Sequence, residues 1–373
     1  MRADEGRERA GVRTEEPVTI LTVAREAGVS KTTASDALRG SGRVSERTRE
    51  AVAQVAERLG YVPNGSARHL RKASTGTIGL HVPEVLTRSS YYMSFVFGVV
   101  EQAARHDYDV TLITSGQRRS RPPRVDGLVL GDPLGGDPVV ESLMATGLPT
   151  VSCERFPGSR QADGVVWSEH ASMLGRLLDH LRESGASRPA LIVAGDESDW
   201  AASVHRGYLE WCAAHGVVPL VRRVSFDASG DEVRAAARAL LGTAGGPGRG
   251  DERGDGRAIS RDAGQGPDEA VAALGRGGDG PLDALVCAPA GAATEVAPLL
   301  REAGVNVLLA SCVDSAATRQ SDPPITAIDL RPKEAGASCA ELLFELLSGA
   351  APLGTERVHP IELSIRTSTR PRP

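Results

Sequence analysis

The N-terminal fold is decided by residues 23–35, VAREAGVSKTTAS. Apolar residues at helical spacing predict one helix here, and Gly28 predicts the turn that ends it. Ser30 is a suitable N-cap for a second helix, residues 31–39, whose first residues then point outward. This arrangement is typical of a helix-turn-helix, which inserts the start of its second helix into the major groove of DNA. The alternative is an ordinary three-helix bundle with a solvated face.

The flanking residues extend this pattern on both sides. Thr19 is a suitable N-cap for the first helix, and Ser45 for a third helix that ends at Gly60. Asn64 precedes a short segment, residues 65–72, which is too short and too polar to be stable as an isolated helix. We expect this segment to order only on a partner.

Charge is distributed unevenly along the chain. Residues 18–72 carry ten Lys and Arg against five Asp and Glu, whereas the net charge of the whole chain is −5. Residues 1–17 carry a net charge of −1, so by difference residues 73–373 carry −9. A basic head on an acidic body indicates that only the head binds a polyanion. We therefore predict double-stranded DNA as its partner, with Lys31, Thr32 and Asp36 facing the bases.

Composition excludes several other classes of protein. The 373 residues predict two or three folded units. The sequence has no apolar run near 18 residues and no leader, so we predict a cytoplasmic protein without a membrane span. The five cysteines and eight histidines lack metal-ligand spacing, and we predict neither metal nor cofactor. HExxH, GxSxG and Walker motifs are absent from the sequence, and the GxGxxG at residues 275–280 follows a helix instead of a strand. We predict that the protein is not an enzyme.

From Thr77 onward, β-rich runs alternate with amphipathic helices, which predicts parallel sheets covered on both faces, in two doubly wound subdomains. Residues 242–280 are rich in Gly, Arg and Asp without periodicity, and we expect a disordered surface insertion there. We also expect a disordered tail at residues 1–17 and a loose one at 366–373. The predicted strands are residues 77–82, 109–114, 127–130, 149–153, 164–167, 189–194, 220–224, 284–287, 305–310 and 325–328. The predicted helices are residues 92–105, 139–146, 171–184, 203–215, 231–241, 294–303 and 334–347.

Several motifs in the head resemble those of one protein family. They are residues 24–30, VSERTR at 44–49, LGYVPN at 59–64 and ARHL at 67–70. In this order and spacing they resemble the DNA-binding head of the LacI/GalR family of bacterial transcriptional regulators. A weaker resemblance continues through Gly98 and PPIT at 323–326 to about residue 365.

This resemblance implies a fold and a function. The fold is an N-terminal all-α helix-turn-helix domain (18–63) plus hinge helix and linker (64–76), followed by an α/β two-lobed periplasmic-binding-protein-like domain (77–365). The function is a sequence-specific transcriptional regulator, a repressor, that binds a pseudo-palindromic operator as a homodimer and is modulated by a small-molecule effector. The alternative is a constitutive DNA-binding dimer whose effector pocket is degenerate.

The resemblance also assigns DNA contacts. Leu70 matches a leucine that wedges into the minor groove, and Arg68 and Arg71 lie near phosphates. Asp36 stands where most of the family has an arginine that contacts guanine. An acid there accepts a hydrogen bond from a cytosine amino group, which predicts an operator half-site that differs from the common family palindrome. The alternative is that Asp36 only pairs with Arg39 on the helix surface. The predicted DNA contacts are Thr19, Ser30, Lys31, Thr32, Thr33, Ser35, Asp36, Arg43, Asn64, Ala67, Arg68, Leu70 and Arg71.

The effector site departs from the family pattern. Val204, Ala290 and Val313 stand where the family places polar ligand contacts, whereas Asp314 is retained. The missing polar partners argue against a pentose or hexose as the effector, because burying a sugar hydroxyl without a hydrogen-bond partner costs binding free energy. Aromatic side chains indicate a flatter or more apolar effector, unless they only form the core between the lobes. The predicted effector contacts are Tyr91, Tyr92, Trp167, Glu169, Trp200 and Asp314.

Overall fold

The computed structural model describes residues 18–61, 74–83, 90–114, 121–195, 197–242 and 281–370. It divides into two compact units, with the division after Ala73. The predicted tail at 1–17, most of the hinge and linker, and nearly all of the insertion at 242–280 lie outside the described residues.

The first unit contains the head, which we define as residues 18–61. It has three helices, α1 (Ile20–Glu26), α2 (Lys31–Arg39) and α3 (Glu46–Arg58). As predicted, Thr19, Ser30 and Ser45 are the N-caps, and each side chain accepts a hydrogen bond from a backbone N–H three residues later. Gly28 takes a left-handed backbone (φ +65°), which a glycine adopts without strain. The helices enclose a small core of Val23, Ala24, Ala34, Ala37, Val52 and Ala56.

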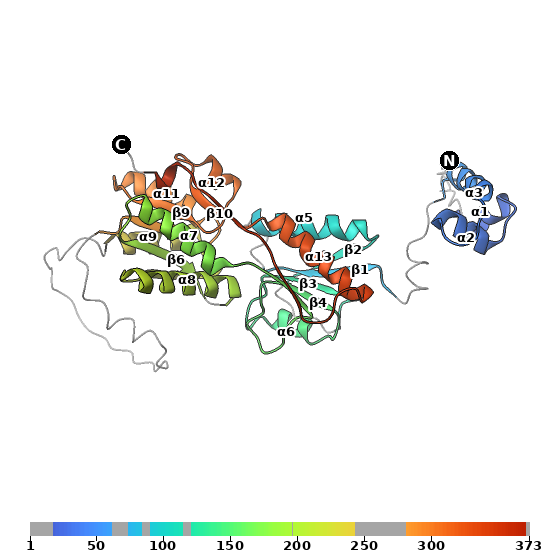
Figure 1. Ribbon diagram of the computed structural model, residues 1–373, viewed down its shortest axis with the longest axis horizontal. Coiled ribbons are helices and arrows are strands. Elements are labelled where there is room, and N and C mark those ends of the chain that lie inside the picture. The colour runs from blue at the N-terminus through green and yellow to red at the C-terminus, as the bar shows by residue number, and fades with distance from the viewer. Residues whose placement is uncertain are drawn as a thin grey trace, which may run out of the picture. The chain divides into compact units, whose positions relative to one another are not determined.

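The second unit has two lobes, each built on a six-stranded sheet (Figure 1). The chain crosses between the lobes three times, after β5, β10 and β11. Every strand pair is parallel except that between β10 and β12. Parallel sheets are covered on both faces, so their strands are buried apolar runs, as in β3 and β6.

The N-terminal lobe has the strand order β11-β5-β4-β3-β1-β2. Helices α5 and α13 cover one face of its sheet and α6 covers the other (Figure 1). Glycines let α5 and α13 approach closely: a Cβ added at Gly98 or Gly336 would overlap the backbone of the other helix. The elements are β1 (Thr77–His81), α5 (Ser90–Arg105), β2 (Asp109–Ile113), β3 (Leu128–Gly131), α6 (Pro138–Met144), β4 (Thr150–Cys153), β5 (Gly164–Trp167), α13 (Pro332–Ser348) and β11 (Thr355–Val358).

The C-terminal lobe has the strand order β12-β10-β9-β8-β6-β7. Helices α7 and α8 pack on one face of this sheet, and α9 and α11 on the other. The elements are α7 (His170–Glu183), β6 (Pro189–Ala194), α8 (Asp199–His215), β7 (Leu220–Val224), α9 (Gly230–Gly242), β8 (Ala284–Cys287), α11 (Ala292–Glu302), β9 (Leu308–Ser311), α12 (Ala316–Gln320), β10 (Thr326–Asp329) and β12 (Glu362–Ser364), followed by the 3-10 turn η2 (Thr367–Thr369).

The structure corrects three expectations. Edge strands β11 and β12 are not predicted, because a polar strand on a sheet edge lacks an apolar run. The predicted strand 305–310 begins only at Leu308. The loose tail is wrong for residues 366–370: two guanidinium nitrogens of Arg366 lie 2.9 and 2.8 Å from the Asp314 carboxylate oxygens, and Thr369 is fully buried. Residues 371–373 lie outside the described residues.

Candidate functional site

The head presents a polar surface at the start of α2. Ser30 Oγ accepts a hydrogen bond from Thr33 N at 3.1 Å, which fixes the first turn of the helix. Lys31 and Thr32 are exposed, whereas Thr33 and Ser35 are partly buried. An exposed ammonium and a hydroxyl at the start of a helix are suitable donors to phosphate oxygens or base edges. The start of α2 therefore has the chemistry that the helix-turn-helix prediction requires.

Asp36 is also only half-buried, and its side chain lies beside the turn after α2. A Cβ built on Gly42 would be 3.0 Å from Asp36 Oδ2. Thr19 and Arg43 are exposed at the start of α1 and after this turn. The side chain of Arg39, like Asn64, Ala67, Arg68, Leu70 and Arg71, is outside the described residues. The DNA contacts assigned to all of these positions stay predictions.

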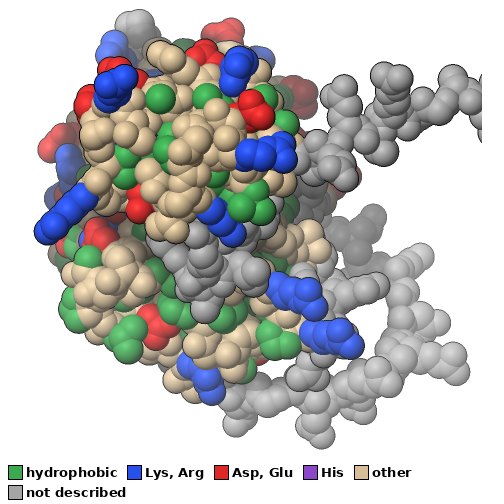
Figure 2. All heavy atoms as spheres, turned by 90° about the vertical axis from the view of Figure 1, so that its right-hand side faces the viewer, with side chains coloured by type: hydrophobic (Ala, Val, Ile, Leu, Met, Phe, Trp, Pro, Cys, Tyr) green, Lys and Arg blue, Asp and Glu red, His purple; other side chains and the backbone are tan. Residues whose placement is uncertain are grey.

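Lys and Arg side chains are scattered over the view in Figure 2 and do not form one continuous patch. The head itself, residues 18–61, carries seven Lys and Arg against five Asp and Glu. Three of the ten basic residues counted above therefore belong to residues 62–72. Much of the positive charge expected at DNA comes from the segment that joins the head to the lobes.

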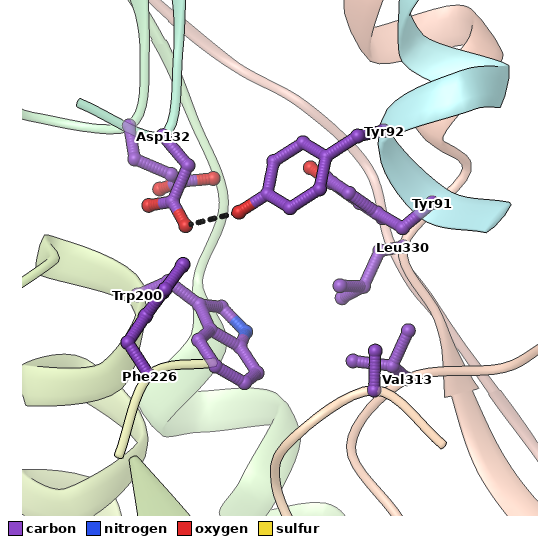
Figure 3. A pocket seen from close by; sticks show the side chains of 9 residues that line it. Tyr91, Tyr92, Asp132, Trp200, Phe226, Val313 and Leu330 are labelled. Atoms are coloured by element: carbon purple, nitrogen blue, oxygen red, sulfur yellow. Dashed lines mark hydrogen bonds between the residues drawn. The ribbon is translucent and has the colours of Figure 1, made fainter. Parts of the chain in front are cut away.

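A pocket lies between the two lobes of the second unit (Figure 3). Its N-terminal lobe wall carries two tyrosines and two acids, and its C-terminal lobe wall carries two aromatic and three aliphatic side chains. The lining residues are Tyr91, Tyr92, Asp132, Glu154, Trp200, Phe226, Ala290, Val313 and Leu330.

Both acids follow strands of the N-terminal lobe directly. Asp132 comes after β3 and Glu154 after β4, at the carboxyl edge of a parallel sheet, where α/β folds place their ligands. Both have left-handed backbones, with φ of 50° and 68°. Such backbones are unfavourable for residues other than glycine and occur often at functional sites.

Asp132 is buried and its ionisation is suppressed. The Tyr92 hydroxyl donates a hydrogen bond to Asp132 Oδ2 at 3.0 Å (Figure 3). Burial, and then the charge of Glu154, raise the pKa of Asp132 to about 7, against the opposing effects of the hydrogen bond and of His170. Asp132 therefore titrates near neutral pH.

Glu154 has a partner within the protein. His170 Nε2 lies 2.9 Å from Glu154 Oε1, as an ion-pair contact and not an aligned hydrogen bond. Burial opposes the charged form of His170, but the negative charges of Glu154 and Asp132 raise the His170 pKa. Glu154 and His170 are thus a buried pair of opposite charge.

The C-terminal lobe wall is mostly apolar. Phe226, Ala290, Val313 and Leu330 present no side-chain nitrogen or oxygen, and Trp200 supplies the one indole N–H. This Nε1 is buried and has no hydrogen-bond partner among the described residues. Val204, which stands at a family polar position, is 2% exposed in the core of this lobe.

Three of the six predicted effector contacts, Tyr91, Tyr92 and Trp200, line the pocket. The other three, Trp167, Glu169 and Asp314, are not among the residues that line it. Trp167 lies under the guanidinium of Arg155, 3.9 Å from the ring centroid, and Glu169 is exposed before α7. Asp314 binds Arg319, Arg366 and Thr318, so its carboxylate anchors the end of the chain.

The sequence interpretation missed Asp132, Glu154, Phe226 and Leu330. The two acids had a detectable signal: Asp132 lies two residues after the predicted strand 127–130, and Glu154 directly follows the predicted strand 149–153, in LVLGD and VSCE. Phe226 and Leu330 lie in connections whose course depends on the lobe arrangement, and no local pattern identifies them.

Two further features, a membrane-spanning helix and a metal-binding cluster, are absent from the described residues. No helix of the described residues has the length and apolarity needed to cross a membrane. No group of three or more His, Cys, Asp or Glu side chains among the same residues could hold a metal ion.

The fold defines a helix-turn-helix domain followed by a two-lobed α/β body with a pocket between its lobes. Three family models match the chain in succession: "Bacterial regulatory proteins, lacI family" at residues 19–64, "Periplasmic binding proteins and sugar binding domain of LacI family" at 75–243, and "Periplasmic binding protein-like domain" at 178–369. The chain belongs to the LacI family of bacterial regulatory proteins.

Individual relatives agree with this assignment. The chain is 30% identical to the regulator RafR of Escherichia coli over 56% of this chain, and it spans 65% of that relative's length. It is 28% identical to CelR of Thermobifida fusca over 94% of this chain and 96% of CelR. Among solved structures, a complex of CelR with cellobiose superposes with a TM-score of 0.62 at 25% identity, covering 94% of this chain and 99% of that one. The Lac repressor dimer bound to operator and an anti-inducer has a TM-score of 0.71 at 19% identity, covering 95% and 100%, and shows the fold alone.

Proposed function

We propose that this protein is a transcriptional repressor that binds a pseudo-palindromic operator as a homodimer and responds to a small-molecule effector in the pocket between its lobes. The observation that carries the proposal is the presence in one chain of a capped helix-turn-helix and a pocket between two lobes that is lined by aromatic and acidic side chains. Closure of the lobes around a ligand would change operator affinity by a coupling free energy of about 1–3 kcal/mol.

An exposed apolar stripe on the N-terminal lobe supports the dimer. Met93, Phe97 and Val100 are 42%, 55% and 40% exposed on one face of α5, and Leu112 of the edge strand β2 is 42% exposed. Residues at positions i, i+4 and i+7 lie on the same side of a helix. Contiguous exposed apolar side chains of this kind mark interaction surfaces. A two-fold dimer would bury two copies of the stripe and bring two heads to one operator.

A constitutive DNA-binding dimer is the second candidate. The observation that favours it is the apolar pair Ala290 and Val313 in the pocket, at positions where the family has polar ligand contacts. This candidate predicts that no small molecule changes operator affinity.

Footprinting of the full chain on sheared DNA of its own genome tests the proposal at one fixed salt concentration. We expect palindromic sites that weaken in a Leu70→Ala variant, because the minor-groove wedge assigned to Leu70 is lost. Uniform, salt-driven binding without enriched sites would reject sequence-specific regulation.

A further inference from the structure

The pocket contains a buried carboxyl that no positively charged side chain of the described residues contacts directly. Asp132 is 7% exposed, and its Oδ2 is used by the Tyr92 hydroxyl. Its Oδ1 is buried without a hydrogen-bond partner among the described residues, and no Lys, Arg or His of this set lies within 4.0 Å of the carboxyl. Glu154, by contrast, faces His170 at 2.9 Å. A buried carboxylate is stable only with a partner, which a ligand can supply.

The rings around Asp132 favour a positive charge there. Tyr91, Tyr92, Trp200 and Phe226 all line the same pocket, and the ring planes of Tyr91 and Tyr92 lie at 88° to each other, edge to face, with centroids 5.1 Å apart. The face of an aromatic ring attracts a cation, more strongly where water is excluded. No Lys or Arg among the described residues lines the pocket, so a cationic ligand would meet no like charge on this part of the lining.

The opposite wall restricts the rest of the ligand. Phe226, Val313 and Leu330 offer only carbon atoms, and Trp200, which is 8% exposed, offers a single N–H. A ligand with hydroxyl groups all around it would leave several unpaired, at about 1–3 kcal/mol each. An apolar body would instead bury its surface against this wall at no such cost.

We propose that the effector pocket takes a small organic ammonium ion, with its charged group against Asp132 and its apolar body against Phe226, Val313 and Leu330. This inference rests on the proposed function, because it names the ligand class of that same pocket. The hydrogen bond from Tyr92 keeps the Asp132 carboxyl directed into the pocket (Figure 3).

Calorimetric titration of the full chain tests the ligand class. The probes are benzylammonium, 2-phenylethylammonium and cyclohexylammonium, each paired with the neutral alcohol of the same shape. We expect at least one ammonium ion to bind at least about 10-fold more tightly than its alcohol, the gain of a charge-assisted hydrogen bond in a buried site. If no ammonium ion binds more tightly than its alcohol, the inference is wrong.

Two variants test whether Asp132 is the source of the preference for the ammonium ion. Asp132→Asn keeps the shape and the acceptor for Tyr92 but removes the charge, and we expect it to abolish the preference for the ammonium ion. Glu183→Gln removes the same charge from an exposed position at the end of α7 and is expected to change nothing. An unchanged preference in Asp132→Asn would overturn the assignment to Asp132. Comparison of each ammonium ion with its alcohol on the unmodified chain does not depend on whether the variant folds.

Operator selection on the same preparations separates the two proposals. A chain that selects a two-fold-symmetric operator but shows no ammonium preference refutes the ligand class alone. A chain that selects no operator refutes the proposed function.

Discussion

The head and the pocket differ in how closely each follows the family pattern. In the head, the motifs, the caps Ser30 and Ser45 and the turn at Gly28 all occur in the family's order. In the pocket, Ala290 and Val313 replace polar positions, although the strands that carry them are intact. Pocket side chains at strand ends can therefore change while the sheet beneath them stays the same. We therefore expect that this protein has kept DNA binding and changed its ligand.

The largest expected effect concerns the surface that would join two heads. Phe97→Glu places a charge in the centre of the α5 stripe, and we expect the dimer dissociation constant to rise at least about 1,000-fold, or about 4 kcal/mol. Sedimentation of the full chain measures this change. Leu353→Glu, at an exposed apolar residue outside the stripe, is the control. A variant that remains as dimeric as the parent would place the interface elsewhere.

The buried carboxyl of Asp132 makes the stability of the second unit depend on pH. The pKa of Asp132 is raised to about 7, so the folded chain holds this proton while the unfolded chain releases it near its ordinary pKa of 3.8. Stability is then lost as pH rises from 3.8 to about 7 and is constant above that value. The groups that act on Asp132 are Glu154, Tyr92, His170 and Ser198.

Asp132→Asn replaces the titrating carboxyl with an amide that does not titrate. Between pH 5 and pH 8 we expect the stability of the variant relative to the parent to increase by about 3 kcal/mol, two pH units at about 1.4 kcal/mol each. Urea unfolding at the two pH values measures the change, with Glu183→Gln as the control. If the free energies of unfolding of Asp132→Asn and of the parent change equally between the two pH values, Asp132 ionises near its ordinary pKa.

In the head, Asp36→Arg tests how base sequence is recognised. We expect the variant to change the preferred half-site by about 1–3 kcal/mol, because arginine donates to guanine whereas the acid accepts from cytosine. Selection from randomised half-sites measures the preference. Glu50→Arg makes the same change of charge on exposed α3 and corrects for added non-specific attraction. Equal preferences for Asp36→Arg and the parent would remove Asp36 from base recognition.

The smallest expected effect is local. Ser30→Ala removes the cap that accepts from Thr33 N, and we expect α2 to lose about 1 kcal/mol of stability. Hydrogen exchange of the α2 amides in the full chain measures this loss. Ser41→Ala, at an exposed position in the turn after α2, should leave the exchange unchanged. Equal exchange in both variants would mean that tertiary packing alone holds the helix start.

Much of the fold was predictable because its signals are local. The bounds of α2, the caps of α1 and α3 and strands such as β6 follow from cap residues and apolar runs. The strands β11 and β12 lack such runs because they lie at sheet edges.

The pocket was predictable only in part, because it forms where segments distant in sequence meet. Tyr91, Tyr92 and Trp200 were found by resemblance, and they line the pocket. The resemblance also suggested Asp314, but it could not show that Arg366, 52 residues later, binds this carboxylate. Phe226 and Leu330 required the arrangement of the two lobes.

The most direct test is the ratio of affinities of the full chain for its best selected operator and for random duplex DNA, measured at one salt concentration. The account predicts a ratio of at least about 1,000, as expected for recognition of base sequence by two heads of one dimer. A ratio near one would mean that the head binds only phosphate charge, and it would contradict the account.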